Sequence, residues 1–156
     1  MIAHLMPVCY NPDMHKALKL NIRPYQVRDQ EAVVDLWKNC GLVVAHNDPW
    51  CDIERKCRVN PEWFLVGVLE GNIVATCMAG YEGHRGWINY LAVSPDFQRK
   101  GIATQLMQRA ETLLIKAGCP KINLQVRETN LAVIDFYESL GFTNDRVISM
   151  GKLLKR

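Results

Sequence analysis

The strongest constraint on the fold is an amphipathic helix that follows directly on an apolar strand. The helix is predicted over residues 103–117, because apolar residues recur at the i, i+3, i+4 and i+7 positions of one helical face. These residues are Ala103, Leu106, Met107, Ala110, Leu113, Leu114 and Ala117. A Gly-Cys-Pro sequence at 118–120 ends the helix, and a Ser-Pro pair closes the strand at 87–93 before it. A strand joined to a helix by a short turn predicts a layered α/β structure.

Local patterns predict the other elements around this pair. The expected strands are 20–25, 63–69, 73–79, 121–126 and one long or two short strands in 142–154, and the expected helices follow caps at Asp29, Asp48 and Asn130. Gly71 and Asn72 are predicted to form a hairpin turn, since both tolerate positive φ. Ile53, Cys57 and, as a further candidate, Trp50 would form the apolar face of the second helix.

The resulting order is β-α-α-β-β-β-α-β-α-β, which predicts a mixed α/β (α+β) domain over residues 20–156. Residues 1–19 contain two prolines, two histidines and no sustained period. They are expected to be an N-terminal extension outside the domain.

Charge and composition exclude several functions. The 19 Lys and Arg against 16 Asp and Glu give a net charge of +3, too small and too scattered for a nucleic-acid-binding surface. No stretch approaches the roughly 20 apolar residues of a membrane span, and the N-terminus lacks the features of a signal peptide. The six cysteines form no C-x-x-C pair and lie mostly among apolar residues, which predicts a reduced, cytoplasmic chain without structural metal.

The segment Gln98-Arg-Lys-Gly-Ile-Ala103 carries the chemistry that the sequence suggests. It joins a strand to a helix N-terminus, where main-chain N–H groups lack partners and the helix dipole is positive. Such a turn is suited to a pyrophosphate. Gly101 would let the ligand approach the backbone, and Arg99 and Lys100 would add positive charge at the rim. Neither a Walker loop nor a G-x-G-x-x-G dinucleotide motif is present.

Two separated segments, LAVSPDFQRKGIATQLMQRAE and RETNLAVIDFYESLGF, resemble the central signatures of the GNAT superfamily of acyl-CoA-dependent N-acyltransferases. The resemblance covers nearly all of residues 20–154. The segments HNDPWCDIERK, GYEGHRG and GCPKI resemble more narrowly the YpeA-type bacterial acetyltransferases. The family implies a mostly antiparallel twisted sheet with about four helices, in which strands 89–93 and 122–126 splay apart.

The resemblance also implies a site for acetyl-CoA. The pantetheine arm would pair with main-chain groups near Leu91 and Val93, and an N–H of Ala92 or Val93, often at a bulge, would polarise the thioester carbonyl. The pyrophosphate would rest on the turn, and Asn130 and Tyr137 would contact the cofactor. The complete expected set is Leu91, Ala92, Val93, Gln98, Arg99, Lys100, Gly101, Ile102, Ala103, Asn130 and Tyr137.

The implied reaction is direct transfer of the acetyl group to a neutral amine. Tyr137 is the candidate acid for the departing sulfur, because a phenol has an ordinary pKa of about 10. Core packing alone is the alternative for this residue. In the ribosomal-protein acetyltransferases that share YESLGF, a glutamate helps to remove the amine proton at the position of Gln125, which cannot do so. Glu82 is therefore the first candidate base, with His84 second and Glu128 third.

The favoured prediction is an acetyl-CoA-dependent N-acetyltransferase whose acceptor is a small-molecule or protein amine. A catalytically idle acyl-CoA-binding module is the alternative from another class, and a ribosomal-protein N-terminal acetyltransferase is a third reading. Neither a nucleic acid nor a membrane is an expected partner, and association into a homodimer is left open.

Overall fold

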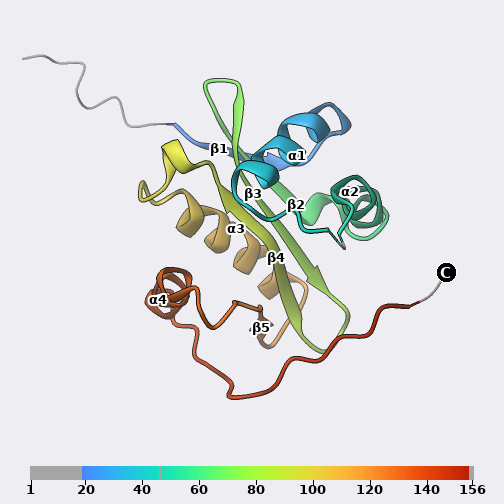
Figure 1. The fold of residues 1–156 in the computed structure, drawn as a ribbon, viewed down its shortest axis with the longest axis vertical. Helices are drawn as coiled ribbons and strands as arrows, with labels where there is room; N and C mark the ends of the chain where they lie inside the picture. The colour runs from blue at the N-terminus through green and yellow to red at the C-terminus, as the bar shows by residue number, and fades with distance from the viewer. Residues whose placement is uncertain (1–18, 46, 155–156) are drawn as a thin grey trace, which may run out of the picture.

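The computed structural model describes residues 19–45 and 47–154 (Figure 1). The predicted extension at 1–19 therefore lies almost wholly outside the described residues. The strands and helices are, in chain order, β1 (Asn21–Pro24), α1 (Gln30–Asn39), α2 (Pro49–Cys57), β2 (Phe64–Leu69), β3 (Asn72–Tyr81), β4 (Gly86–Val93), α3 (Ile102–Lys116), β5 (Ile122–Asn123) and α4 (Leu131–Ser139). The short 3-10 helices are η2 (Val27–Asp29), η3 (Pro61–Trp63) and η4 (Pro95–Phe97).

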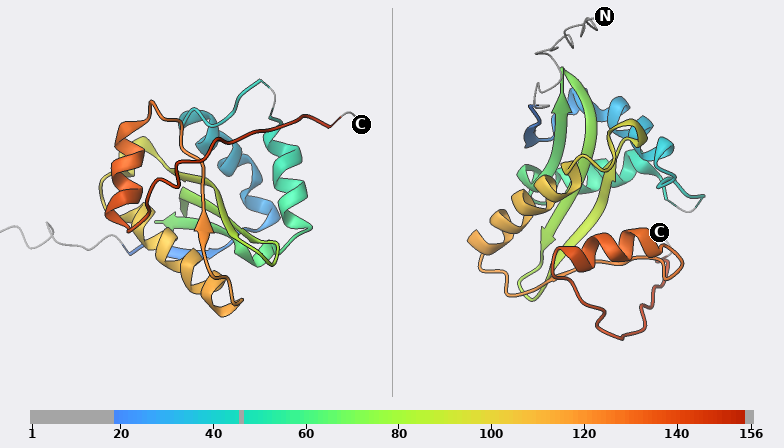
Figure 2. Two further views of the ribbon diagram at one scale, coloured as in Figure 1. Left: turned by 90° about the horizontal axis from the view of Figure 1, so that it is seen from below. Right: turned by 90° about the vertical axis from the view of Figure 1, so that its left-hand side faces the viewer.

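The sheet has the order β1-β2-β3-β4-β5 and is antiparallel except for the β4–β5 pair. Helices α1 and α2 cover one face, and α3 and α4 cover the other (Figures 1 and 2). Each face has its own core, one around Trp37 and Phe64 and the other around Leu106 and Leu114. The predicted mixed α/β architecture is thereby confirmed. None of the helices in the described ranges combines the length and apolar character that a membrane crossing requires.

Two predicted helix caps have different outcomes. The Asp48 carboxylate accepts hydrogen bonds from the N–H groups of Trp50 and Cys51 at 2.9 and 3.3 Å, as expected of an N-cap. Asp29 stands at the N-cap position of α1 but makes no cap bond to that helix. Its carboxylate instead accepts two bonds from the Arg23 guanidinium, at 2.6 and 2.9 Å. A charged, two-point partner displaces the local cap because such bonds are stronger.

The hairpin between β2 and β3 is confirmed, but its turn is one residue earlier than predicted. Leu69 pairs with Asn72, and the residues with positive φ are Glu70 and Gly71. Asn72 is therefore a strand residue. On α2, Ile53 is buried as predicted, whereas Trp50 is 44% exposed and lies off the apolar face.

The C-terminal strands were predicted wrongly. The expected strand 121–126 is reduced to β5, and residues 142–154 form no strand in the described structure. They run as an exposed chain past β5 and α4 (red in Figure 1). A strand needs a hydrogen-bonding neighbour. Because residues 124–126 leave the sheet after β5, residues 142–154 have no strand there to pair with.

Gly86 begins β4 where this strand meets β5 and the end of α3. A Cβ at this position would lie 2.8 Å from Sγ of Cys119, a thiol that donates to the carbonyl oxygen of Lys121, and 3.3 Å from Cδ1 of Leu114. Gly86→Ala should lower the free energy of unfolding by about 1–3 kcal/mol, as overpacking does. Gly80→Ala on β3 is the control, because a Cβ there meets nothing within 4 Å. Urea denaturation of both variants checks this, and equal stabilities would contradict it.

Candidate functional site

The turn between β4 and α3 presents a row of main-chain N–H groups. Arg99 and Gly101 both adopt left-handed conformations, with φ of 60° and 74°. Alternating conformations of this kind turn successive N–H groups toward a common side. Within residues 19–45 and 47–154, the N–H groups of residues 99–103 find no hydrogen-bond acceptor. They stand at the positive end of the α3 dipole, so the turn can hold an anion such as a pyrophosphate.

Two polar side chains of this turn brace the turn itself. Nε2 of Gln98 donates to the carbonyl oxygen of Val93 at 3.0 Å and ties the turn to the end of β4. Nζ of Lys100 donates to the carbonyl oxygen of Asp96 at 2.9 Å and lies 5.1 Å from the centre of the Phe97 ring. Both residues were expected to contact the cofactor. In this structure they fix the backbone that would meet the anion.

A β-bulge interrupts β4 just before the turn. Thr76 of β3 pairs with Ala92 and Met78 pairs with Asn89, so one residue of β3 lies opposite two of β4. The extra length is taken up at Tyr90, whose φ is 49°. The bulge therefore precedes Ala92 and Val93, the two residues of which one was expected to carry the polarising N–H.

The bulge reverses which side chains face which core. Ile88 belongs to the core on the α3 side. Regular alternation would place Tyr90 on that side as well, but Tyr90 and Ala92 pack toward α1 and α2. Leu91 and Val93 consequently pack toward α3. The two predicted cofactor contacts, Leu91 and Val93, thus share the face that also carries α3 and its N-terminal turn.

Four residues that sequence reasoning did not bring together meet at the bulge. Oγ1 of Thr76 donates to the carbonyl oxygen of Tyr90 and accepts from Nε1 of Trp37, both at 2.9 Å. The Trp37 and Tyr90 rings stack with centroids 3.9 Å apart. The Tyr90 hydroxyl donates to the Asp52 carboxylate at 2.6 Å, and burial followed by this carboxylate raises the pKa of the phenol. We call Trp37, Thr76 and Asp52 around Tyr90 the Tyr90 clamp.

Strands β4 and β5 separate after a short contact. Their pairs are Gly86 with Ile122 and Trp87 with Asn123. Beyond them β4 continues to Val93, whereas residues 124–126 leave the ladder. The predicted splay between 89–93 and 122–126 is present in the described chain. It opens toward the end of β4 that carries the bulge and the turn.

A groove of about 1140 Å³ lies between β5, the second half of α3, α4 and the C-terminal segment. Tyr137 lines this groove, and burial raises the pKa of its phenol. The residue is 8% exposed, and its ring packs against Phe136 and Phe142, with centroids 5.1 and 5.5 Å away. The hydroxyl makes no hydrogen bond to any described residue. Tyr137 is thus a core aromatic whose polar atom remains available.

Gln125, Glu128 and Asn130 belong to the segment between β5 and α4, part of which lines this groove. Asn130 occupies the N-cap position of α4 without a side-chain cap bond, and its side chain is exposed. Glu128 also lines the groove. Nε2 of Gln125 donates to the hydroxyl of Ser149, which keeps this amide on the C-terminal segment.

Glu82 lies in the loop between β3 and β4, at the opposite end of β4 from the turn. Its carboxylate accepts from the N–H groups of His84 at 2.7 Å and Arg85 at 3.0 Å. The bond from His84 is the main cause that holds the pKa of Glu82 below its usual range. From Gly86 to Tyr90 the strand advances by about 13 Å at roughly 3.3 Å per residue. The structure therefore does not bring Glu82 or His84 beside the bulge.

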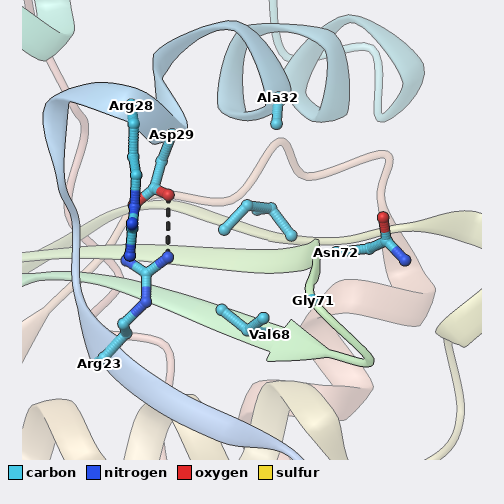
Figure 3. A pocket seen from close by; sticks show the side chains of 8 residues that line it. Arg23, Arg28, Asp29, Ala32, Val68, Gly71 and Asn72 are labelled. Carbon is cyan, nitrogen blue, oxygen red and sulfur yellow. Dashed lines mark hydrogen bonds and ion pairs between the residues drawn. The ribbon is translucent and has the colours of Figure 1, made fainter.

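A second cavity, of about 420 Å³, lies on the α1 side and is lined by Arg23, Arg28, Asp29, Ala32, Val68, Gly71, Asn72 and Ile73 (Figure 3). Its central charges are already paired, since Arg23 holds Asp29 by two bonds. The Arg23 bonds lower the pKa of Asp29. This cavity lacks the row of unpaired N–H groups that the turn between β4 and α3 presents. Across the described residues, no three His, Cys, Asp or Glu side chains gather closely enough to hold a metal ion.

The chain is similar in sequence to known proteins. The model of the acetyltransferase (GNAT) family matches residues 16–142. An acetyltransferase of Yersinia enterocolitica is 48% identical over 135 residues, which cover 86% of this chain and 96% of the relative.

The fold is also similar to that of solved structures. The aminoglycoside N-acetyltransferase AAC(6′)-Iy, solved with a bisubstrate analogue containing coenzyme A, has a TM-score of 0.71 at 20% identity and covers 86% of this chain and 99% of its own. The ribosomal-protein alanine N-acetyltransferase of Escherichia coli has a TM-score of 0.63 at 26% identity and covers 80% and 77%.

Proposed function

The chain belongs to the acetyltransferase (GNAT) family, and we propose that it transfers the acetyl group of acetyl-CoA to the nitrogen of a primary amine. The observation that carries this proposal is the row of unpaired N–H groups at residues 99–103, at the N-terminus of α3. Left-handed Arg99 and Gly101 shape this row, and the residues present fit a pyrophosphate. Leu91, Val93, Gln98, Lys100, Ile102, Ala103, Asn130 and Tyr137 complete the proposed cofactor site.

Acetyl-CoA supplies an acetyl group that is already activated on sulfur. In the proposed reaction a carbon–nitrogen bond forms, the carbon–sulfur bond breaks, the amine loses one proton and the sulfur gains one. A main-chain N–H that follows the bulge, at Ala92 or Val93, stabilises the negative charge on the carbonyl oxygen. Tyr137 donates the proton to the sulfur through its unpartnered hydroxyl.

The acceptor is proposed to be a small-molecule amine or a protein amine. Support comes from the neighbours, one solved with coenzyme A joined to an aminoglycoside derivative and one named for a ribosomal-protein alanine. A homodimer remains part of the proposal. We also propose that the enzyme works in the reducing cytoplasm, in keeping with the free thiols of Cys40, Cys51, Cys57, Cys77 and Cys119.

The experiment that tests the function uses the full-length protein, acetyl-CoA and a panel of amines. We expect amine-dependent loss of acetyl-CoA, with the acetylated acceptor identified by mass spectrometry. Mass spectrometry is preferred to a thiol reagent because the free cysteines of the chain would react with such a reagent. Tight acetyl-CoA binding without turnover on any amine would favour the idle acyl-CoA-binding module instead.

The proton of the ammonium form, whose pKa is near 10, must leave before the amine can attack. We propose that Glu82 accepts it through a chain of water molecules, since the carboxylate stays ionised at neutral pH under its lowered pKa. Glu82→Gln should then depress kcat/KM at neutral pH, and the activity should recover as the pH rises toward the pKa of the amine. Gln can still accept the loop hydrogen bonds, so the loop survives the change. A pH–rate profile identical to that of the wild type would assign proton removal to bulk water.

A further inference from the structure

Tyr90 adopts a conformation that its residue type disfavours. A left-handed φ of 49° costs an aromatic residue roughly 1–2 kcal/mol. Such strain persists only where the surrounding structure holds the residue at several points. The strained residue is also the one that shifts the register between β3 and β4.

Three contacts from three different elements hold Tyr90. Thr76 on β3 is fully buried and binds the Tyr90 carbonyl oxygen at 2.9 Å. Trp37 on α1 stacks on the ring at 3.9 Å and donates to the same Thr76 hydroxyl. Asp52 on α2 accepts from the phenol at 2.6 Å. The backbone, the ring and the hydroxyl of Tyr90 are therefore each fixed separately.

The held residue controls the part of β4 that the reaction would use. With Tyr90 left-handed, Leu91 and Val93 turn toward α3, and the N–H groups that follow the bulge change direction with them. In a β4 strand without the bulge the alternation would be shifted by one residue, so each of these N–H groups would point toward the opposite lateral side of the strand. The direction of the donor thus depends on contacts made on the far side of the sheet.

We propose that the Tyr90 clamp is a positioning device, in which Thr76 and Asp52 hold the β4 bulge so that the following N–H meets the carbonyl oxygen of the acetyl group. This inference rests on the proposed acetyl transfer. Thr76 and Asp52 touch neither substrate in this scheme and act through Tyr90. The clamp also couples α1 and α2 to the reacting centre, although both helices cover the opposite face from α3.

The first test compares Thr76→Val, which keeps the shape but removes the hydroxyl, with Thr76→Ser, which keeps the hydroxyl. Thr76→Val should lower kcat by about 10- to 100-fold, somewhat less than deletion of an oxyanion donor. The dissociation constant for coenzyme A should change by less than about twofold, because the turn at 98–103 is untouched. Thr76→Ser should restore most of kcat. Equal kcat values for both variants and the wild type would overturn the proposal.

Two further variants keep the test decisive if Thr76→Val fails to fold. Tyr90→Phe retains the stacked ring and loses the hydroxyl that binds Asp52, and we expect a smaller fall in kcat, of about 3- to 10-fold. Asp52→Asn keeps a hydrogen-bond acceptor for the phenol and should leave kcat and KM near wild-type values. A rise in KM for the amine in Asp52→Asn would instead assign Asp52 to acceptor binding and overturn its place in the clamp.

A measurement without turnover separates this inference from the proposed function. The amide NMR signals of Leu91 and Ala92 in the free protein should shift in Thr76→Val and Tyr90→Phe, and should stay near their wild-type positions in Thr76→Ser. Unmoved signals would overturn the clamp even if the enzyme is active. Absence of turnover in the wild type, with the signals moving as expected, would overturn the proposed function and leave the clamp in place as a device that sets the bulge.

Discussion

Replacing Gly101 with Glu should weaken the binding of coenzyme A by at least about 100-fold, or about 2.7 kcal/mol. The new carboxylate would stand at the row of N–H groups, where the proposed pyrophosphate also carries negative charge. A Cβ at Gly101 meets no atom of the protein within 4 Å. Any loss of affinity therefore results from repulsion between the new side chain and the ligand, and not from a clash within the protein. Titration calorimetry with coenzyme A measures the effect.

Gly101→Ala is the matched control for this prediction. Both variants place an L-residue at a φ of 74°, so both should lose about 1 kcal/mol of stability from backbone strain. Only the Glu variant adds charge, and the Ala variant should lose less than about tenfold in affinity. If both variants bind coenzyme A as tightly as the wild type, the pyrophosphate does not bind at this turn. Equal large losses would point to the shape of the turn and not to its charge.

Tyr137→Phe should lower kcat by about 100-fold while coenzyme A binding stays almost unchanged, in line with the loss of a general acid. The substitution is clean because the hydroxyl binds no described residue, so its removal leaves no buried partner unsatisfied. The ring contacts with Phe136 and Phe142 remain. Burial raises the pKa of the phenol, so Tyr137 stays protonated through the alkaline range. The wild-type kcat should therefore show no decline from ionisation of Tyr137 up to about pH 10.

Tyr25→Phe is the control for removing a phenol hydroxyl. Tyr25 stacks on Phe64 at 4.6 Å on the other face of the sheet, and burial raises its pKa to about 12. This variant should retain wild-type kcat. Normal turnover in Tyr137→Phe would mean that Tyr137 only packs. Loss of thermal stability in Tyr137→Phe alone would lead to the same conclusion.

The elements that sequence patterns predicted correctly are those that depend on local periodicity. Helix α3 follows its apolar stripe, and its end coincides with Gly118, which has a positive φ. The cap of α2 at Asp48 needs only the next three residues, so its signal is also local. These features could be predicted because each residue that decides them lies within about one turn of the others.

The errors share a dependence on pairings between different elements of the fold. Asn72 is a better intrinsic turn residue than Glu70, yet the pairing of Leu69 with Asn72 fixes the turn one residue earlier. Asp29 leaves its cap for Arg23, a partner from another element. The strands expected after 123 lack the neighbour that would have paired with them.

The candidate site divides in the same way. The turn at 98–103 could be predicted because a strand end, a glycine and a helix start follow one another in the sequence. The bulge could not be predicted from the sequence. It depends on a register shift between β3 and β4 and on contacts from α1 and α2. Trp37 and Asp52 look like an ordinary core residue and an ordinary first-turn acid until the fold brings them to Tyr90.

The single extra residue in β4 also sets the substitution tolerance of this strand. Before Tyr90, even-numbered positions such as Ile88 face the α3 core, and Asn89 is exposed. After it, the odd-numbered positions Leu91 and Val93 take that place. Within eight residues, the strand therefore contains two halves in which opposite positions, even-numbered and then odd-numbered, require apolar side chains. Divergence among relatives can then proceed by point substitution in either half, whereas a one-residue insertion or deletion in β4 would exchange the inward and outward positions of the half that is proposed to bind the cofactor.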